Sequence, residues 1–237
     1  MAHDSDQVVI IGDSFAAHRT GDSDWPRLLT ALQTGVNQEP RGQGFGGASW
    51  WSTRKCLLAE LEIQVPEVLI LCHTESGRIP SDFDFGLNVS SVFDSGSTIR
   101  IPQGQEHNYH PNIKSAAAQY YEYLISNDYV DWAQSAWFRE LDTILEQYAV
   151  PKVIHLHCFA PKVRNLSRNP LLDNHVYRFD YGLTNSVPLW NLCCDVDQRT
   201  AKNHFTIDQN IRLAHSLNSI IENYHSMPRC FDMKLLG

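Results

Sequence analysis

Near the start of the chain stands Val8-Val9-Ile10-Ile11-Gly12-Asp13-Ser14-Phe15, in which four β-branched residues are stopped by Gly-Asp-Ser. A short run of this kind, bounded by a turn signal, predicts a strand that is buried on both faces of a parallel sheet. Open α/β sheets bind their ligands beyond the carboxyl ends of the strands. Ser14, which follows directly after this strand, is therefore the first candidate for a functional side chain.

Composition and charge restrict the class of protein. The chain has 237 residues, of which 43% are hydrophobic and 19% charged, and its formal net charge is −8. The length suits one α/β domain, so we predict a single domain over residues 1–237. The negative charge argues against nucleic acid or an anionic membrane surface as a partner, since both require a basic face. No apolar run approaches the ~20 residues of a membrane-spanning helix.

The cysteines and histidines give no sign of a metal or cofactor. The six cysteines include no Cys-x-x-Cys pair, so neither a zinc motif nor a redox motif is indicated. Free thiols in apolar runs are typical of a reducing compartment, and the polar start of the chain is not a signal peptide, so we expect a cytoplasmic location. The residues from which a metal site could be drawn come from several segments and have no recognised ligand spacing: His73, Glu75, His107, His110, His155 and His157.

Hydrophobic periodicity predicts alternating strands and helices along the chain. We expect helices at 24–32, 114–126, 129–148 and from Thr206 onward, an edge strand at 36–40, and buried strands at 66–72, 151–159 and 187–194. The expected core faces are Trp25, Leu28, Leu29 and Leu32; Trp132, Ala136, Leu141, Ile144 and Leu145; and Ile211, Leu213, Leu217, Ile220 and Ile221.

This order of elements predicts an α/β fold, a three-layer α/β/α sandwich with a central parallel sheet of about five strands, of the flavodoxin-like type. Residues 79–113 lack any clear periodicity and are too many for an ordinary loop. We therefore expect an insertion there, acting as a lid or a contact surface.

A glycine-rich stretch, Arg41-Gly42-Gln43-Gly44-Phe45-Gly46-Gly47, follows the expected edge strand and precedes a helix. Four glycines in six residues indicate unusual backbone angles or close approach to a ligand, and N–H groups at such a place can form an anion site. No lysine follows, so the stretch is not a phosphate loop. Trp50 and Trp51 come next; at least one of them is expected to pack, and Trp50 is a candidate for contact with substrate.

The strand ending in Gly-Asp-Ser, and the histidine of Asn203-His204-Phe205-Thr206 before the amphipathic last helix, resemble the SGNH (GDSL-like) hydrolases. The resemblance implies that Ser14 is a nucleophile and His204 its base. It also implies an oxyanion hole made by the N–H groups of Ser14 and Gly47, with Gly44 at the spacing of the family's glycine motif. No cofactor is implied.

Among the positions that depart from the family pattern, two bear directly on the chemistry. Glu75 stands where the family has an asparagine that donates to the oxyanion; an ionised carboxylate repels an oxyanion unless it is protonated or paired, for example with Arg78. Ala201 stands where the family has the aspartate that orients the histidine. Asp195 and Asp197, which are close in the sequence, are the candidates for that role, and a backbone carbonyl is the other possibility.

The sequence thus predicts a serine-dependent acyl-ester hydrolase of the carboxylesterase or carbohydrate deacetylase type, acting on a small-molecule or glycan ester. The alternative is a non-catalytic SGNH-like binding or structural module with a degenerate site. A metal-dependent phosphoesterase is a third possibility, which would require a bound metal. Neither the natural substrate, nor the oligomeric state, nor assembly into a larger particle follows from the sequence.

Overall fold

The computed structural model describes residues 8–17, 23–44, 48–75, 77–78, 116, 119–124, 126–159, 179–193 and 204–233. Several positions singled out in the sequence lie outside the described residues: Gly47, the insertion at 79–113, His107, His110, Asp195, Asp197 and Ala201.

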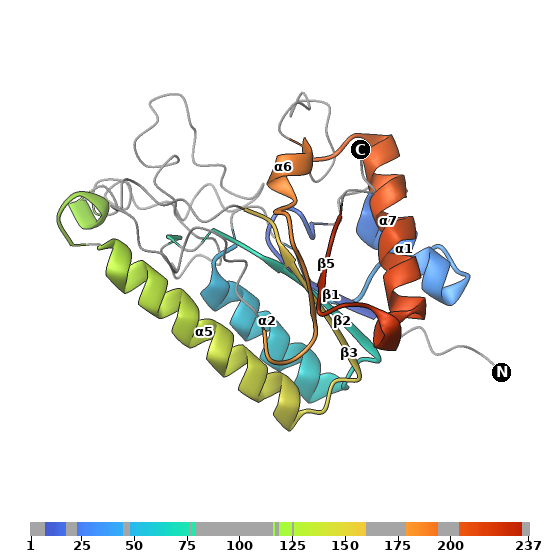
Figure 1. Cartoon of the computed structure of the whole chain (residues 1–237), viewed down its shortest axis with the longest axis horizontal. Helices are drawn as coiled ribbons and strands as arrows, with labels where there is room; N and C mark the ends of the chain where they lie inside the picture. The colour runs from blue at the N-terminus through green and yellow to red at the C-terminus, as the bar shows by residue number, and fades with distance from the viewer. Residues whose placement is uncertain are drawn as a thin grey trace, which may run out of the picture.

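A five-stranded parallel sheet forms the centre of the molecule, in the order β1-β2-β3-β4-β5 (Figure 1). The strands are β1 (Val8–Gly12), β2 (Val68–His73), β3 (Lys152–His157), β4 (Leu183–Asn185) and β5 (Cys230–Phe231). Every residue of β1 and β2 is buried, as expected for strands covered on both faces. The register pairs Gly12 with Cys72, so that the segments after β1 and β2 leave the sheet at the same edge.

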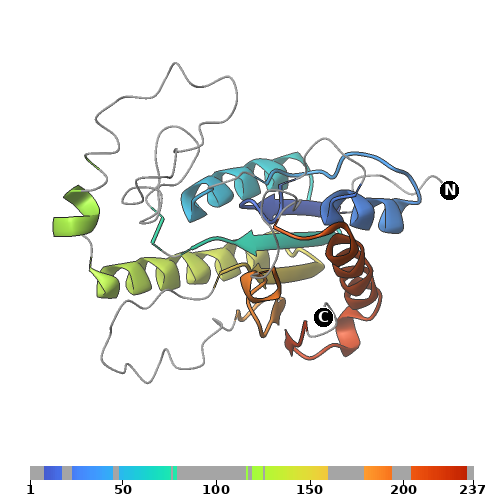
Figure 2. The same ribbon diagram turned by 90° about the horizontal axis from the view of Figure 1, so that it is seen from above.

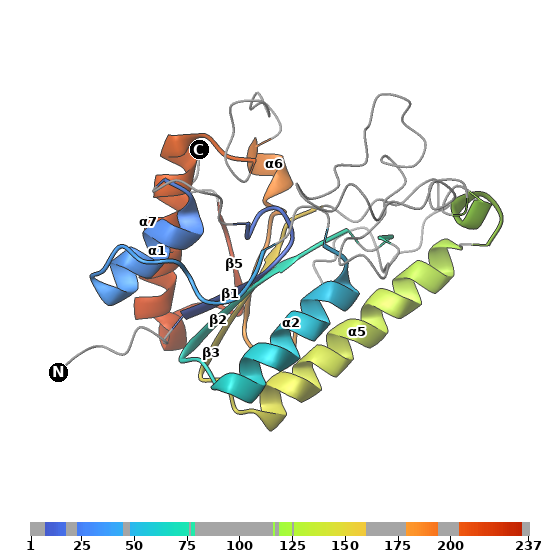
Figure 3. The ribbon, with the colours of Figure 1, turned by 180° about the vertical axis from the view of Figure 1, so that it is seen from behind.

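Helices cover both faces of this sheet, which confirms the three-layer α/β architecture (Figures 1 and 3). On one face lie α1 (Trp25–Thr34) and α7 (Ile207–Glu222), and on the other α2 (Trp50–Ile63) and α5 (Asn127–Gln147). Neighbouring residues of β1 alternate between the two cores: Ile10 packs with α1 and α7, and Ile11 with α2 and α5. Seen from above, α2 lies on the β1 side of the sheet and α5 on the β3 side (Figure 2).

The prediction of an edge strand at 36–40 is wrong. Its place beside β1 is taken by the start of the glycine-rich stretch, where Arg41 and Gly44 form isolated parallel bridges with Val9 and Gly12. The N–H of Ile10 donates to the carbonyl of Arg41 at 2.9 Å. Proline has no N–H to contribute to a ladder, and pairing starts at the residue after Pro40.

The expected last strand at 187–194 is also wrong. Residues Trp190–Cys193 form the short helix α6, and the sheet continues through β4 and β5 instead. A short apolar run cannot be assigned to a strand or a buried helix by periodicity alone. Here the chain leaves the sheet after Asn185, whose side-chain amide donates to the carbonyl of Val187 at 2.8 Å.

The helices differ from the expected ones in detail. Within the expected helix 114–126, Tyr120–Leu124 form a π-helical turn, and α5 begins at Asn127, capped by Ser126. Three residues that the sequence places in the core are exposed instead: Trp132 at 67%, Leu32 at 41% and Ile211 at 39%. The buried stripe of α5 consists of Trp137, Phe138, Leu141, Ile144 and Leu145. No helix in the described part of the chain is both long and apolar enough to cross a membrane.

Candidate active site

The side chains of Ser14 and His204 meet at the carboxyl end of β1. Ser14 lies in the turn after β1, His204 lies just before α7, and Ser14 Oγ is 2.7 Å from His204 Nε2 across 190 residues of sequence. When the serine hydroxyl donates to Nε2, the proton of the neutral imidazole is on Nδ1. Ser14 is partly exposed, so that its hydroxyl is accessible. The structure thus brings together the two residues that the sequence predicts as nucleophile and base.

Asp13 orders the turn that presents Ser14. Its carbonyl accepts the N–H of Ala16 at 3.0 Å, and its side-chain Oδ1 accepts the N–H of Phe15 at 2.9 Å. Gly12 enters the turn with φ +154°, and a Cβ there would lie 2.3 Å from the carbonyl oxygen of Cys72. Only glycine fits this position, because it needs both the unusual φ and the missing side chain.

His204 is held in a backbone conformation that few residues adopt. Its φ is +69°, in the left-handed region, which costs on the order of 1–3 kcal/mol and is found most often at functional sites. The imidazole stacks on Phe15, with ring centroids 4.5 Å apart, and meets the edge of Trp190 at 5.6 Å. The helix α6, which the sequence misassigns as a strand, therefore supplies one wall of the site.

A chain of hydrogen bonds connects the segments that carry Ser14 and the histidine. The indole Nε1–H of Trp25 donates to the carbonyl of Phe15 at 2.7 Å, and its backbone N–H donates to Asn210 Oδ1 at 2.9 Å. The amide of Asn210 donates in turn to the carbonyl of Thr206 at 3.0 Å. Thr206 caps α7 in a capping box. Through Trp25 and Asn210, the first and last helices fix the turn and the histidine relative to each other.

Gly44, predicted as part of the oxyanion or substrate site, lies against the turn after Ser14. A Cβ on Gly44 would lie 2.2 Å from the backbone carbon of Ala16 and 2.4 Å from the N of Ala17. The glycine-rich stretch therefore reaches the nucleophile turn only because this residue has no side chain. Gly47, the predicted oxyanion donor, lies outside the described residues, and Ala48, which follows it in the sequence, is buried.

The charge next to Ser14 belongs to Asp13, which is completely buried. Burial raises the pKa of its carboxyl from 3.8 to about 6, Glu75 adds to the rise, and Arg78 opposes it. Nη1 of Arg78 lies 4.0 Å from Oδ2 of Asp13. Arg78, which the sequence offers as a partner for Glu75, thus makes an ion pair with Asp13.

Comparisons of the chain with family models, curated proteins and solved structures give no match. The SGNH resemblance stays a prediction, and the geometry of the chain's own residues carries the functional argument.

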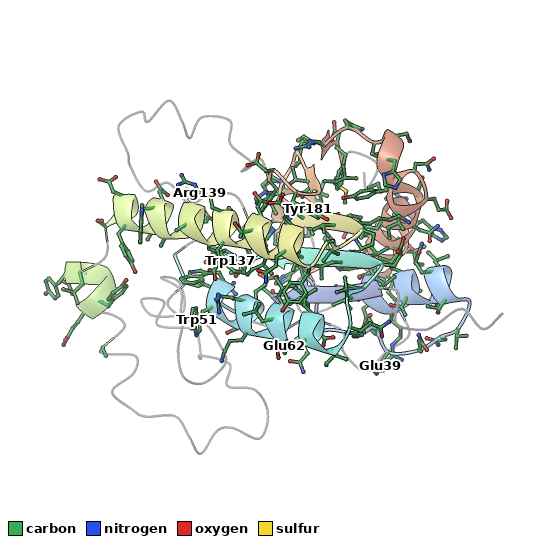
Figure 4. The ribbon with its side chains drawn as sticks, turned by 90° about the horizontal axis from the view of Figure 1, so that it is seen from below. Glu39, Trp51, Glu62, Trp137, Arg139 and Tyr181 are labelled. Atoms are coloured by element: carbon green, nitrogen blue, oxygen red, sulfur yellow. The ribbon has the colours of Figure 1, made fainter. Side chains whose placement is uncertain are left out.

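Trp50, a candidate for contact with substrate, and Glu75, at the family's oxyanion position, line a small pocket between α2, α5 and the end of β2. Its volume is about 10 Å³, room for about one water molecule. The other lining residues are Thr53, His73, Thr74, Gln134, Trp137 and Phe138. Trp50 stacks on Trp137, with ring centroids 6.3 Å apart, and Figure 4 shows Trp137 between α5 and α2. Ser14 and His204 are not among its lining residues, so the pocket is separate from the Ser–His pair.

Three histidines of the neighbouring strands gather behind this pocket. His155 Nε2–H donates to the carbonyl of Tyr181 at 2.9 Å, so its Nδ1 accepts the Nε2–H of His73, also at 2.9 Å. His157 lies beside His73, with ring centroids 5.4 Å apart. Burial lowers the pKa of His155 to about 3 and that of His73 well below 6.5, so both rings are neutral at pH 7. Among the described residues, no group of three His, Cys, Asp or Glu is arranged to hold a metal ion.

Sequence reasoning found the Ser14–His204 pair but missed the residues that hold it in place. Trp25 was expected only to pack, and Phe15, Trp190 and Asn210 had no expected role in the site. One signal was available for Asn210, because it is a polar residue on the buried stripe of α7. A buried amide needs hydrogen-bond partners, so its place on that stripe indicates a specific contact.

Proposed function

We propose that this chain is a serine-dependent acyl-ester hydrolase, of the carboxylesterase or carbohydrate deacetylase type, in which Ser14 is the nucleophile and His204 the general base. The observation that carries the proposal is the 2.7 Å distance between Ser14 Oγ and His204 Nε2. A serine hydroxyl is a weak nucleophile at neutral pH, and a base within hydrogen-bond reach activates it. The pair also lies beyond the carboxyl end of a parallel strand, where such sheets bind ligands.

The proposed reaction is acyl transfer to Ser14, followed by hydrolysis. Ser14 Oγ attacks the ester carbonyl carbon while its proton passes to His204 Nε2, giving a tetrahedral oxyanion. The oxyanion collapses, the bond to the alcohol oxygen breaks, and the alcohol takes the proton from Nε2. Water then loses a proton to Nε2 as it attacks the acyl-serine, and the collapse of the second tetrahedral intermediate releases the acid and restores Ser14.

The oxyanion would be held by backbone N–H groups, those of Ser14 and, by the SGNH resemblance, Gly47. One such donor is typically worth about 10²–10³ in turnover. Asp195 or Asp197 is proposed to orient His204 by accepting its Nδ1–H, in place of the aspartate that the family has where this chain has Ala201. By the same resemblance, the substrate would be a small-molecule or glycan ester.

A fluorophosphonate probe tests the proposal directly, because it reacts with activated serines. We expect the purified protein to gain one probe per chain, located on Ser14 by peptide mass spectrometry, and to hydrolyse p-nitrophenyl acetate. The variants Ser14→Ala and His204→Gln should lose both activities. Ser226→Ala and His225→Gln, at exposed positions near the end of α7, are the matched controls and should react like the natural chain.

A folded protein that gains no probe on Ser14 would contradict the proposal. The repulsion of an oxyanion by Glu75 would then mark a degenerate site, and the alternative of a non-catalytic binding or structural module would apply. Hydrolysis of p-nitrophenyl phosphate that survives in Ser14→Ala and stops on treatment with EDTA would instead indicate the metal-dependent phosphoesterase class.

A further inference from the structure

Arg78 is a charged residue in a place where charges are costly. Its side chain is only 6% exposed, and its Nε is buried with no hydrogen-bond partner among the described residues. Taking a guanidinium out of water is unfavourable unless its charge is compensated. The surroundings of Arg78 therefore call for an explanation beyond packing.

Three contacts define the position of this guanidinium. Nη1 donates to the carbonyl of Ala48 at 3.1 Å and lies 4.0 Å from Oδ2 of Asp13. The guanidinium carbon lies 5.3 Å from the ring centroid of Phe159, and that ring meets the edge of Phe15 at 5.4 Å. Arg78 thus contacts the segments that follow β1 and β3, together with the one that precedes α2.

We propose that Arg78 is a positioning residue, which joins the Asp13 turn carrying Ser14 to the segment at Ala48 that follows the glycine-rich stretch. The inference rests on the proposed function, since it assigns Arg78 to the same site. Asp13 precedes Ser14, and Ala48 follows the predicted oxyanion donor Gly47. One cation therefore sets the distance between the nucleophile and the segment expected to bind the oxyanion.

Arg78 acts on the turn through the charge of Asp13. The groups that face this carboxyl are Arg78, Glu75, Thr74 and the thiol of Cys158, together with the N–H of Phe15. Glu75 raises the pKa of Asp13 and Arg78 lowers it, so removing the guanidinium would raise the pKa of this carboxyl further and favour its protonated form. A neutral acid accepts the Phe15 N–H less strongly than a carboxylate does, and the turn would loosen.

The first experiment needs no enzymatic activity. In protein carrying ¹³C-labelled aspartate, the Asp13 carboxyl signal is assigned by its loss in Asp13→Asn and titrated by NMR in Arg78→Met. We expect its pKa to rise by at least one unit, and to rise less in Arg78→Lys, which keeps the charge. Arg54→Met, which breaks the surface ion pair with Glu140, is the matched control and should leave it unchanged. An unchanged pKa in Arg78→Met would overturn the proposal.

The second experiment measures the reaction. The rate of Ser14 labelling and kcat for p-nitrophenyl acetate should fall about 10- to 100-fold in Arg78→Met, with KM little changed and the acid limb of the pH profile moved to higher pH. Asp13→Asn combined with Arg78→Met should be no slower than Asp13→Asn alone, because the first change already removes the charge that Arg78 holds. Independent, multiplying losses would overturn the proposal.

The two experiments remain decisive if Arg78→Met does not fold or if the natural chain is not labelled. If Arg78→Met does not fold, as can happen when one partner of a buried ion pair is removed, the double variant replaces it, since it lacks both charges. Its rate relative to Asp13→Asn then decides. If the natural chain is not labelled at all, the proposed function fails, and with it the role of Arg78 in that reaction. The NMR titration still shows separately whether Arg78 and Asp13 are coupled.

Discussion

The backbone N–H of Trp25 donates to the side-chain oxygen of Asn210 at 2.9 Å, a hydrogen bond that connects the start of α1 to the first turn of α7. Asn210 is completely buried, and its amide donates to the carbonyl of Thr206. Since Trp25 also holds the carbonyl of Phe15, this one amide links the nucleophile turn to the histidine segment.

Asn210→Leu keeps the size of the side chain and removes the hydrogen bonds of its amide, with Trp25, Thr206 and Phe205. We expect a loss of about 1–3 kcal/mol in the free energy of unfolding, because the buried N–H of Trp25 loses its acceptor. Ser14 should also be labelled more slowly, because His204 is no longer held in position relative to the Ser14 hydroxyl. Denaturant unfolding and the rate of probe labelling measure the two effects.

Asn218→Leu is the matched control for this prediction. Asn218 lies on the same helix, but its hydrogen bonds with Gln33 and Glu222 are more exposed, so the change should cost less than about 1 kcal/mol and leave labelling unaffected. Equal effects in the two variants would show that Asn210 has no special part in holding the site.

Gly44→Ala tests the close approach of the glycine-rich stretch to the nucleophile turn. The new Cβ would lie 2.2 Å from the backbone carbon of Ala16, and backbone atoms cannot move aside cheaply. We expect lower stability and at least tenfold slower labelling of Ser14. Gly77→Ala is the control, because no atom of the described residues lies within 4 Å of its added Cβ. If Ser14 is labelled in both variants as fast as in the natural chain, Gly44 does not pack closely against the backbone of Ala16.

The sequence predicts the centre of the fold better than its edges. The strands β1, β2 and β3 were predicted because strands covered on both faces consist of continuous apolar residues, which stand out from their surroundings. The strands β4 and β5 have three and two residues and carry no comparable pattern. Their place in the sheet depends on tertiary contacts, such as the N–H of Thr184 donating to the carbonyl of Arg229 at 2.7 Å.

The residues of the candidate site likewise fall into those that the sequence predicts and those that it does not. Ser14 and His204 could be predicted because each stands at a recognisable element boundary, and the resemblance supplies the order in which they occur. The contacts of Arg78 with Asp13 and Ala48 could not, because they join three segments whose distances in space the sequence does not specify. The exposure of Trp132 was missed for a similar reason. Helical spacing defines a stripe, but the packing of α5 against α2 decides which stripe is buried.

The buried histidines predict that stability falls on acidification. In the unfolded chain a histidine takes up a proton near pH 6.5, whereas folded His155 resists protonation until about pH 3. Between these values the unfolded state binds more protons, so each such histidine lowers the free energy of unfolding by roughly 1.4 kcal/mol per pH unit as the pH falls. Urea unfolding from pH 7.5 to 4 measures the slope.

His155→Gln should flatten this dependence, since glutamine does not titrate and its amide can still donate to the carbonyl of Tyr181. His215→Gln, at an exposed position on α7, is the control and should leave the slope unchanged. A slope that is the same in His155→Gln and in the natural chain would show that His155 does not carry the effect.

The buried carboxyl of Asp13 should make the free energy of unfolding depend on pH in the opposite sense. It should also set stability against the reactivity of Ser14. Its folded pKa of about 6 lies above the unfolded 3.8, so between these values the folded state binds more protons and stability falls as the pH rises. Asp13→Asn mimics the protonated acid and should stabilise the protein at pH 7 by up to roughly 3 kcal/mol, a gain that disappears below pH 4. The same variant should be labelled more slowly at Ser14, because the turn loses its charged acceptor.

The control is Asp208→Asn, on the exposed first turn of α7, which should change neither the stability nor the rate of labelling. Urea unfolding at pH 7, 5 and 4 decides the matter: a gain that does not change with pH would mean that Asp13 is not an ionised group buried beside the nucleophile.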